Sequence, residues 1–270
     1  LDEKLGNSKA RFFPGVAYRH ILKIKGHQET LLSECTPPHD IPGRAVASYL
    51  PKGPGSQILR DLMDRSEPIL KVHPVNQSRI RHGELPATSI WLFWPSCQVP
   101  DLPPFQKLYG VDGAMISGVD LLNGIAKMAG MATLKVPGVT DGLDNDYKAQ
   151  AEGALRALEV HNLVVVHVEA PDEAGHSGLI DEKINAIEKI DAEIVGRLLT
   201  YKQDSLRLMI LPDHPTPTDI QTHTADPVPF LLWGPGFKAS GGRRFTEREA
   251  KSSGFHEQTG HNLIKKLFFN

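Results

Sequence analysis

The stretch LVVVHVEAPDEAGH, residues 163–176, decides the fold class of this chain. Its first six residues are almost all apolar and β-branched, and they show no alternation of polar and apolar side chains. A strand that is apolar on both faces is typical of a parallel sheet covered by helices. A loop with proline and glycine follows directly and carries Asp172 and His176. The stretch therefore predicts an α/β fold with polar side chains beyond the carboxyl end of a buried strand.

A second stretch, RLMIL at residues 207–211, repeats this arrangement and leads into a loop that carries Asp213, His214 and His223. In open α/β sheets, ligands bind outside the carboxyl ends of the strands, so we expect both loops to face one crevice. Taken singly, each aspartate could have a purely structural role, as a helix cap or a turn residue. Their joint placement at two strand ends predicts one site with two carboxylates and three imidazoles. His167, inside the first strand, is expected to be a core or supporting histidine.

The mixture of ligand types indicates which metals the site would take. Carboxylate oxygen and imidazole nitrogen together suit borderline ions such as Mn, Zn or Co, with Mg as a further candidate. Five protein ligands exceed the number that one catalytic ion uses when it keeps an open position, yet they are few for two ions. We therefore expect two divalent metal ions and some ligands from elsewhere. Two ions about 4 Å apart suit phosphoryl transfer, because they can hold the attacking and the leaving oxygen.

Composition excludes several other function classes. The chain has 270 residues and a net charge of -2, which gives no field that would gather nucleic acid or a membrane surface. Its apolar runs are too short for a transmembrane helix. Cys35 and Cys97 are isolated, so neither a disulfide framework nor a thiolate metal site is expected. We expect a cytoplasmic enzyme acting on a small molecule. The polar start at Leu1, without Met, suggests residues missing upstream.

The pattern of turn formers and apolar runs predicts two domains. Residues 1–97 are rich in proline and glycine and favour a smaller α+β domain, with strands at 16–24 and 90–93 and a helix at 57–64. Residues 98–270 alternate strands and helices. The strands are expected at 113–117, 132–136, 163–168, 208–211 and 228–232, and the helices at 119–128, 147–158 and 181–199.

Three motifs carry a family resemblance: HVEAPDEAGH at 167–176, LPDHPTPT at 211–218 and THTADPVPF at 222–230. They closely resemble those of the archaeal-type cofactor-independent phosphoglycerate mutases, which have bacterial members and belong to the alkaline-phosphatase superfamily. Segments such as FPGVAYRHIL and TPPHDIPG, near the start, support it. The resemblance implies an alkaline-phosphatase-like, mostly parallel sheet flanked by helices, whose first strands would lie upstream, and an inserted α+β substrate domain.

The resemblance also implies a reaction and residue roles. The reaction is the interconversion of 3-phosphoglycerate and 2-phosphoglycerate through a phosphoserine. One ion would be held by Asp172, His176 and His223, and the other by Asp213 and His214. The nucleophilic serine and a further metal-binding aspartate would precede the segment FPGVAYRHIL, so no serine of this chain is assigned as the nucleophile.

Residues 1–97 would form the inserted domain that binds phosphoglycerate. A substrate with a carboxylate and a phosphate favours planar guanidinium donors. The candidates are Arg19 and Arg79, together with His39 and Asp40. Each also has a purely structural interpretation, as an exposed strand residue, a surface charge or part of a turn.

The chain departs from the family after TSIWL, where a glycine-rich turn is usual and Phe93, Trp94 and Pro95 stand here. Glycine allows positive φ and close approach of a ligand, so this change bears on the substrate more than on the metals. Alternative activities on the same scaffold therefore stay open. They are a metal-dependent phosphatase or phosphonate hydrolase and a homoserine kinase, and an inactive fragment is the non-enzymatic alternative.

Overall fold

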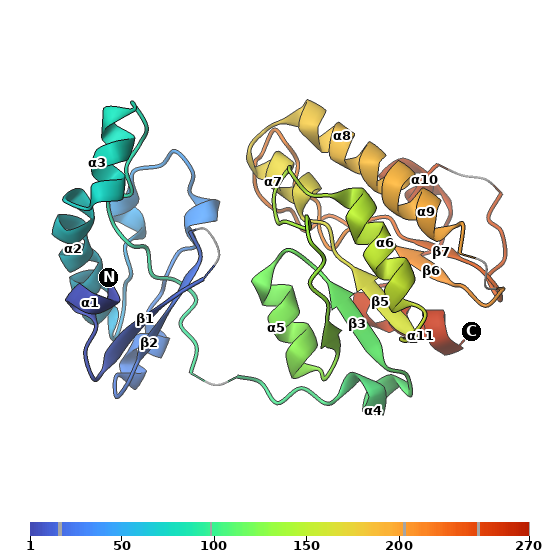
Figure 1. Ribbon diagram of the computed structural model, residues 1–270, viewed down its shortest axis with the longest axis horizontal. Coiled ribbons are helices and arrows are strands. Elements are labelled where there is room, and N and C mark those ends of the chain that lie inside the picture. Colours follow the sequence, from blue (N-terminus) through green and yellow to red (C-terminus); the bar gives the residue numbers. More distant parts are fainter. Residues whose placement is uncertain (16–17, 98, 202–203, 242–243, 270) are drawn as a thin grey trace. The chain divides into compact units, whose positions relative to one another are not determined.

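The computed structural model describes residues 1–15, 18–97, 99–201, 204–241 and 244–269. The chain divides into two compact units, Leu1–Pro100 and Asp101–Asn270, and each is described by itself (Figure 1). The division falls three residues after the boundary expected from the sequence. Among the described residues, no helix combines the length and the apolar character needed to cross a bilayer.

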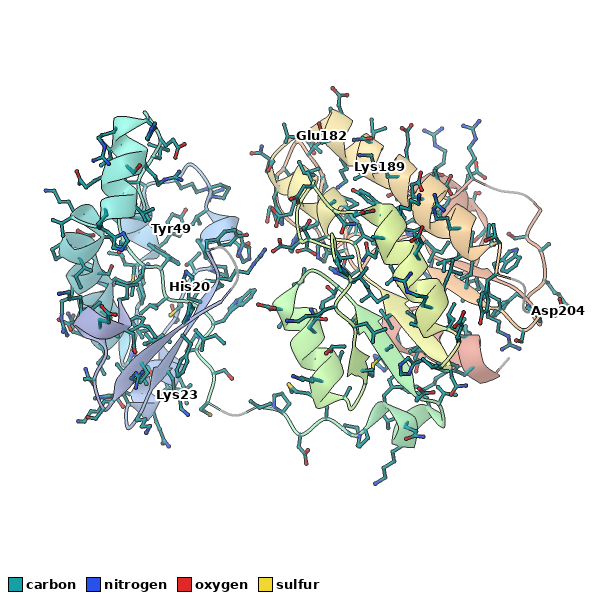
Figure 2. All side chains as sticks on the ribbon, viewed as in Figure 1. His20, Lys23, Tyr49, Glu182, Lys189 and Asp204 are labelled. Atoms are coloured by element: carbon teal, nitrogen blue, oxygen red, sulfur yellow. The ribbon has the colours of Figure 1, made fainter. Side chains whose placement is uncertain are left out.

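The first unit combines a hairpin with short helices. Strands β1 (Ala10–Pro14) and β2 (His20–Ile24) pair antiparallel, with Phe12 opposite Leu22. The helices are α1 (Asp2–Leu5), α2 (Ser56–Lys71) and α3 (Pro74–Arg81), with 3-10 turns η1 (Gln28–Leu32), η2 (Pro38–Asp40) and η3 (Val46–Tyr49). Figure 2 labels His20 and Lys23 on β2 and Tyr49 at the end of η3. The α2 helix is amphipathic and buries one face, as the apolar spacing at 57–64 predicts.

Two strand predictions in this unit are wrong in part. The strand expected at 16–24 begins at His20, its partner β1 was not foreseen, and residues 16–17 lie outside the described residues. Residues 90–93 form no strand. Instead, side chains hold this segment: the amide of Ile90 donates to the Ser66 hydroxyl at 3.0 Å, and the Trp91 indole donates to the Thr36 carbonyl at 2.7 Å. These bonds satisfy polar groups that a sheet would otherwise pair.

Trp94 takes the conformation that glycine usually supplies. Its φ is 51°, in the left-handed region, where most side chains meet their own backbone. Although 63% exposed, Trp94 stacks edge-on with His39 at 5.6 Å and contacts Phe93 at 5.0 Å between ring centroids. Aromatic contacts of this kind contribute about 0.5–1.5 kcal/mol each, which offsets a left-handed penalty of about 1–2 kcal/mol.

This balance predicts that two substitutions at Trp94 change the free energy of unfolding by different amounts. Both Trp94→Ala and Trp94→Gly remove the ring contacts, but only the glycine variant relieves the backbone. We expect Trp94→Gly to be more stable than Trp94→Ala by about 1 kcal/mol in urea unfolding. Equal midpoints for the two variants would show that the positive φ costs nothing here.

The second unit contains a parallel sheet, in agreement with the predicted α/β class. Its strands are β3 (Gly113–Ile116), β4 (Ala132–Thr133) and β5 (Leu163–Val166), in the order β4-β3-β5. Ile116 lies opposite Val166, and Ala114 lies opposite Ala132. The expectation that RLMIL belongs to this sheet is wrong for the described residues. Strand β6 (Leu208–Ile210) pairs antiparallel with β7 (Leu231–Trp233), with Met209 opposite Leu232.

The helices of this unit include α4 (Phe105–Tyr109), α5 (Asp120–Met128), α6 (Tyr147–Ala157), α7 (Ala170–His176), α10 (Glu247–Ser252), the turn η5 (Gly260–Asn262) and α11 (Leu263–Phe269). The three helices expected from the sequence form at α5, α6 and 181–199, whereas the sequence does not predict α4, α7, α10 and α11 and favours a loop at 170–176. The helix expected over 181–199 is one continuous rod of three parts: α8 (Ile180–Lys189), the π-helical η4 (Ile190–Val195) and α9 (Gly196–Leu198). A π-helical insertion shifts the face that the rest of the rod presents.

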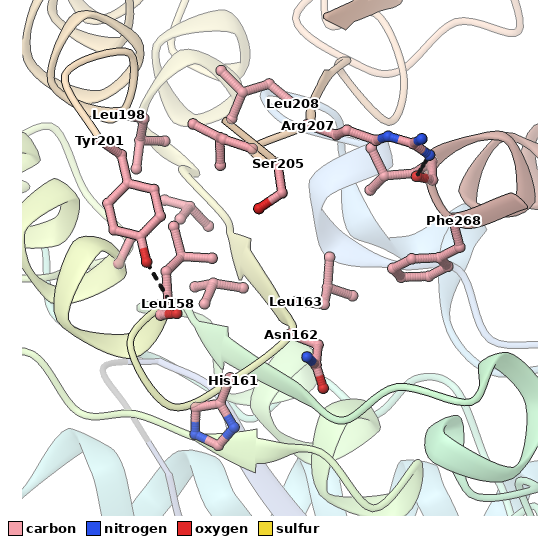
Figure 3. A pocket seen from close by; sticks show the side chains of 15 residues that line it. Leu158, His161, Asn162, Leu163, Leu198, Tyr201, Ser205, Arg207, Leu208 and Phe268 are labelled. Carbon is pink, nitrogen blue, oxygen red and sulfur yellow. Dashed lines mark hydrogen bonds between the residues drawn. The ribbon is translucent and has the colours of Figure 1, made fainter. Parts of the chain in front are cut away.

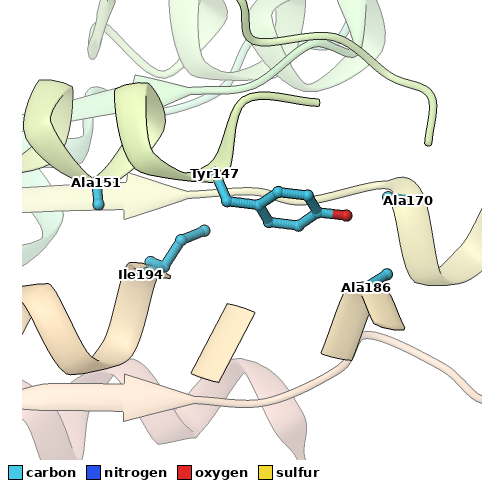
Figure 4. Packing of buried hydrophobic residues seen from close by; sticks show 5 residues of the cluster. All are labelled: Tyr147, Ala151, Ala170, Ala186 and Ile194. Atoms are coloured by element: carbon cyan, nitrogen blue, oxygen red, sulfur yellow. The ribbon is translucent and has the colours of Figure 1, made fainter. Parts of the chain in front are cut away.

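The core of the second unit is built around one ring and several alanines. Tyr147 and Ala151 of α6 pack with Ala170 of α7 and with Ala186 and Ile194 of the α8–η4 rod (Figure 4). Because alanine side chains are small, the helix backbones come close to the Tyr147 ring. The ring fills the space between these helices. The Lys189 ammonium lies 5.7 Å from the Tyr147 ring centroid and makes a cation–π contact with it. This core holds α7 at the end of β5.

A cavity of about 320 Å³ lies beside β5, lined mainly by apolar side chains of β5, α6, α11 and the residues around β6 (Figure 3). Leu163 donates its amide to the Asp112 carbonyl, on the β3 side. Because successive amides of a strand point to opposite edges, the amides of Val164 and Val166 face away from β3. Across the cavity, the Tyr201 hydroxyl bonds to the Leu158 carbonyl at 3.2 Å.

Candidate metal centre

Two neighbouring ligands come from the helix that follows β5. The chain leaves β5 at Val166 and enters α7, whose proline at the second position suits a helix start. Asp172 and His176 are four residues apart and so share one face of this helix. Their side chains meet, with 3.3 Å between the His176 Nε2 and the Asp172 Oδ2 atoms.

The loop after β6 brings the other candidates to the same place. The His223 Nε2 atom lies 3.0 Å from the His176 Nε2 atom and 3.4 Å from Asp172 Oδ1. The rings of His214 and His223 stack with centroids 3.7 Å apart. Within the cluster, Asp213 contacts its neighbour, with 3.3 Å between its Oδ2 atom and the His214 Nε2 atom. All five side chains predicted from the sequence thus form one connected cluster.

The donor set fits a divalent ion. One atom each from Asp172, His214 and His223 lies within 4.8 Å of the others. The two Nε2 atoms of His176 and His223 face each other at hydrogen-bond distance beside the same carboxylate. Converging imidazole nitrogens and a carboxylate are the ligands that borderline divalent ions accept. His214 shares this group with Asp172, whereas the sequence-based division placed these two residues on different ions.

A buried layer supports the cluster from the sheet side. His167 Nδ1 lies 3.0 Å from the Ser117 hydroxyl, and its Nε2 lies 3.3 Å from a Glu169 carboxylate oxygen. Burial lowers the pKa of His167, against the opposing effect of Asp213 and Asp172, so the ring is neutral at neutral pH. The fully buried Gln150 donates to the His167 carbonyl at 2.7 Å. His167 therefore lies in the supporting layer, as its place in the strand suggested.

Thr216, Lys183 and Gly175 also contact this site, and the sequence analysis did not select them. The Thr216 hydroxyl donates to Asp172 Oδ1 at 2.5 Å, and Lys183 donates to the Thr216 carbonyl at 2.5 Å. Gly175 lies against the same threonine. The only sequence signal was the PTPT run itself, which is typical of many loops.

The four substrate-binding candidates all lie in the first unit. Arg79, on α3, donates to the Leu85 carbonyl at 2.7 Å and pairs with Glu84 at 3.1 Å. The Arg19 guanidinium lies 4.7 Å from the Tyr18 ring centroid. His39 and Asp40 adjoin each other in η2, with 3.8 Å between His39 Nε2 and Asp40 Oδ1. Arg79 thus stabilises the end of its own helix.

Comparison with known proteins agrees with this chemistry. The family model of the metalloenzyme superfamily matches residues 11–267, which include the whole cluster. The chain belongs to this superfamily. Several curated relatives that match most of its length are named 2,3-bisphosphoglycerate-independent phosphoglycerate mutase, and the resemblance noted in the motifs is thereby confirmed.

Three curated relatives show the extent of the match. The 2,3-bisphosphoglycerate-independent phosphoglycerate mutase of Methanosarcina acetivorans is 42% identical over 94% of this chain and 64% of its own length. That of Methanosarcina barkeri is 47% identical over 86% and 59%. A probable mutase of the same name from Geobacter sulfurreducens is 40% identical over 97% and 66%. The metalloenzyme chain thus spans about two thirds or less of the length of these relatives.

Solved structures support the fold. A Pyrococcus horikoshii protein aligns with a TM-score of 0.66 and 27% identity, over 78% of this chain and 56% of that one. A cofactor-independent phosphoglycerate mutase from Thermoplasma acidophilum aligns with a TM-score of 0.53 and 22% identity, over 98% and 66%. The second likeness concerns the fold alone.

Proposed function

We propose that this metalloenzyme chain is the metal-binding part of a cofactor-independent phosphoglycerate mutase, which interconverts 3-phosphoglycerate and 2-phosphoglycerate. The observation that carries the proposal is the convergence of Asp172, His176, His214 and His223 at the ends of two strands. The name shared by relatives that are 40–47% identical supports the same reaction.

The proposed roles follow the ligand types. Asp172, His176 and His223 hold one divalent ion, and Asp213 and His214 hold a second, with Mn, Zn or Co as the expected metals and Mg as a further candidate. The ions supply Lewis acidity and neutralise phosphoryl charge when bound. The chain's own residues orient these ligands, and the neutral His167 ring keeps its Nδ1 atom against the Ser117 hydroxyl. No serine of this chain is assigned as the nucleophile.

Residues 1–97 are proposed to recognise the substrate. Arg19 and Arg79 offer guanidinium donors suited to a phosphate and a carboxylate, and His39 and Asp40 offer further polar contacts. Trp94 packs on His39, so the position that departs from the family pattern touches one of these candidates. The proposed location is the cytoplasm, where phosphoglycerate is available.

The proposal is tested with 3-phosphoglycerate and an enolase-coupled assay. Because no serine of this chain is assigned as the nucleophile, the assay uses the full-length protein. We expect formation of 2-phosphoglycerate that is lost after chelation and restored by added Mn, Zn or Co, because the ligand set accepts these ions. The same samples are assayed for inorganic phosphate and for ATP-dependent phosphorylation of homoserine. Release of phosphate, or phosphorylation of homoserine, without any 2-phosphoglycerate would replace the mutase assignment with one of the alternative activities.

A further inference from the structure

One buried hydroxyl connects helix α7 of the metal centre with the loop after β6. Thr216 follows β6 in the chain and is only 4% exposed. Its Oγ1 atom donates to Asp172 Oδ1 on α7 at 2.5 Å and lies 3.3 Å from His214 Nδ1. The shorter contact, to a charged acceptor, is the stronger bond. A single side chain from the loop after β6 thus holds the carboxylate that α7 contributes.

Thr216 is itself fixed from two further directions. The Lys183 ammonium, on α8, donates to the Thr216 carbonyl at 2.5 Å. On the other side, a Cβ atom at Gly175 would lie 2.5 Å from the Thr216 carbonyl oxygen and 2.9 Å from its Cγ2 atom. The absence of a side chain at position 175 therefore lets α7 and the loop touch directly. A hydroxyl held this firmly can hold the Asp172 side chain in one rotamer.

The direction of the bond matters for metal binding. A hydroxyl that donates to Oδ1 restricts rotation of the carboxyl group. The Oδ2 atom then faces His176 Nε2 at 3.3 Å, while Oδ1 stays 3.4 Å from His223 Nε2. Without the hydroxyl, the carboxylate would be free to turn away from one of these imidazoles.

We propose that Thr216, anchored by Lys183 and Gly175, is a positioning residue that orients Asp172 for metal binding. The inference rests on the proposed metal site, but it concerns a residue that is not among the proposed metal ligands. Supporting partners of a metal ligand commonly contribute 10–100-fold to affinity.

The test measures affinity for Mn²⁺ by calorimetry on the whole protein. We expect Thr216→Val to bind Mn²⁺ about 10–100-fold more weakly, because it keeps the shape and removes the donor, and Thr216→Ser to restore affinity to within about 3-fold. Thr200→Val is the matched control: it also removes a threonine hydroxyl, but one that is exposed and donates to the Arg197 backbone carbonyl. Lys183→Met, which frees the carbonyl but keeps the hydroxyl, is expected to weaken binding by a smaller factor.

The outcomes separate this inference from the proposed reaction. Unchanged Mn²⁺ affinity in Thr216→Val, or an equal loss in Thr216→Ser, would overturn the positioning role. If Thr216→Val does not fold, Thr216→Ser and Lys183→Met decide: full affinity in the first with reduced affinity in the second supports the role, and any other result contradicts it. Hydroxyl-dependent Mn²⁺ binding without mutase activity would uphold the inference and refute the reaction.

Discussion

Asp172→Asn is expected to weaken Mn²⁺ binding by more than about 100-fold, a larger effect than loss of a supporting partner. Asp172 is the carboxylate in the three-residue group with His214 and His223, and it contacts His176 and Thr216 as well. An amide has the same size but no charge, and its nitrogen does not bind a metal ion. Calorimetry with Mn²⁺ measures the loss directly, and metal-dependent mutase activity should vanish with it.

Asp181→Asn is the matched control for that result. Asp181 lies in the first turn of α8, is exposed, and does not belong to the cluster. Its substitution removes the same charge from the same unit, so a general electrostatic effect would appear in both variants. If the two substitutions weaken Mn²⁺ binding equally, Asp172 is not a ligand and the centre has been placed wrongly.

Gly175→Ala is expected to cost about 1–3 kcal/mol of unfolding free energy and to reduce Mn²⁺ affinity as well. The added methyl group would lie 2.5 Å from a carbonyl oxygen and 3.0 Å from the Cβ atom of Thr216. These are backbone and buried atoms, so the loop itself must move away from α7. That movement separates Asp172 and His176 from His214 and His223. Urea unfolding measures the first effect and calorimetry measures the second.

Gly124→Ala is the control for this prediction, and it is expected to raise the free energy of unfolding where Gly175→Ala lowers it. Gly124 lies inside α5 and has no atom within 4 Å of an added Cβ. Alanine there should stabilise the helix by about 0.5–1 kcal/mol and leave metal binding unchanged. If Gly175→Ala also proves neutral or stabilising, α7 and the loop are not in tight contact, and the anchoring of Thr216 described above is wrong.

The sequence predicted those parts of the fold that depend on local patterns. The runs at 113–117 and 163–168 became parallel neighbours, and the helices at 119–128 and 147–158 formed within two residues of their expected ends. The direction of pairing was not predictable for 208–211, because an apolar run has the same composition in an antiparallel pair. Residues 90–93 looked like a strand, yet the Ile90 amide donates to the Ser66 hydroxyl and the Trp91 side chain donates to the Thr36 carbonyl, so side chains hold this segment in place of a neighbouring strand.

The same limit applies to the metal centre. Asp172 and His176, like Asp213 and His214, could be selected because carboxylates and imidazoles beyond strand ends are typical of metal sites. Thr216 and Gly175 could not, because threonine and glycine are common loop residues and their roles arise only from a contact between segments about 40 residues apart. The division of the ligands between two ions stays a prediction.

The two compact units also bear on how such an enzyme can diversify. On the proposed assignment, every metal ligand of this chain lies within residues 101–270 and every substrate contact within residues 1–100. Each unit has buried residues of its own, so a substitution in one need not disturb packing in the other. Selection for a new substrate can therefore change residues of the first unit while the proposed metal-binding residues of the second unit stay the same. Trp94, which has a positive φ and lies where the family resemblance implies a glycine-rich turn, is the kind of change that such a division permits.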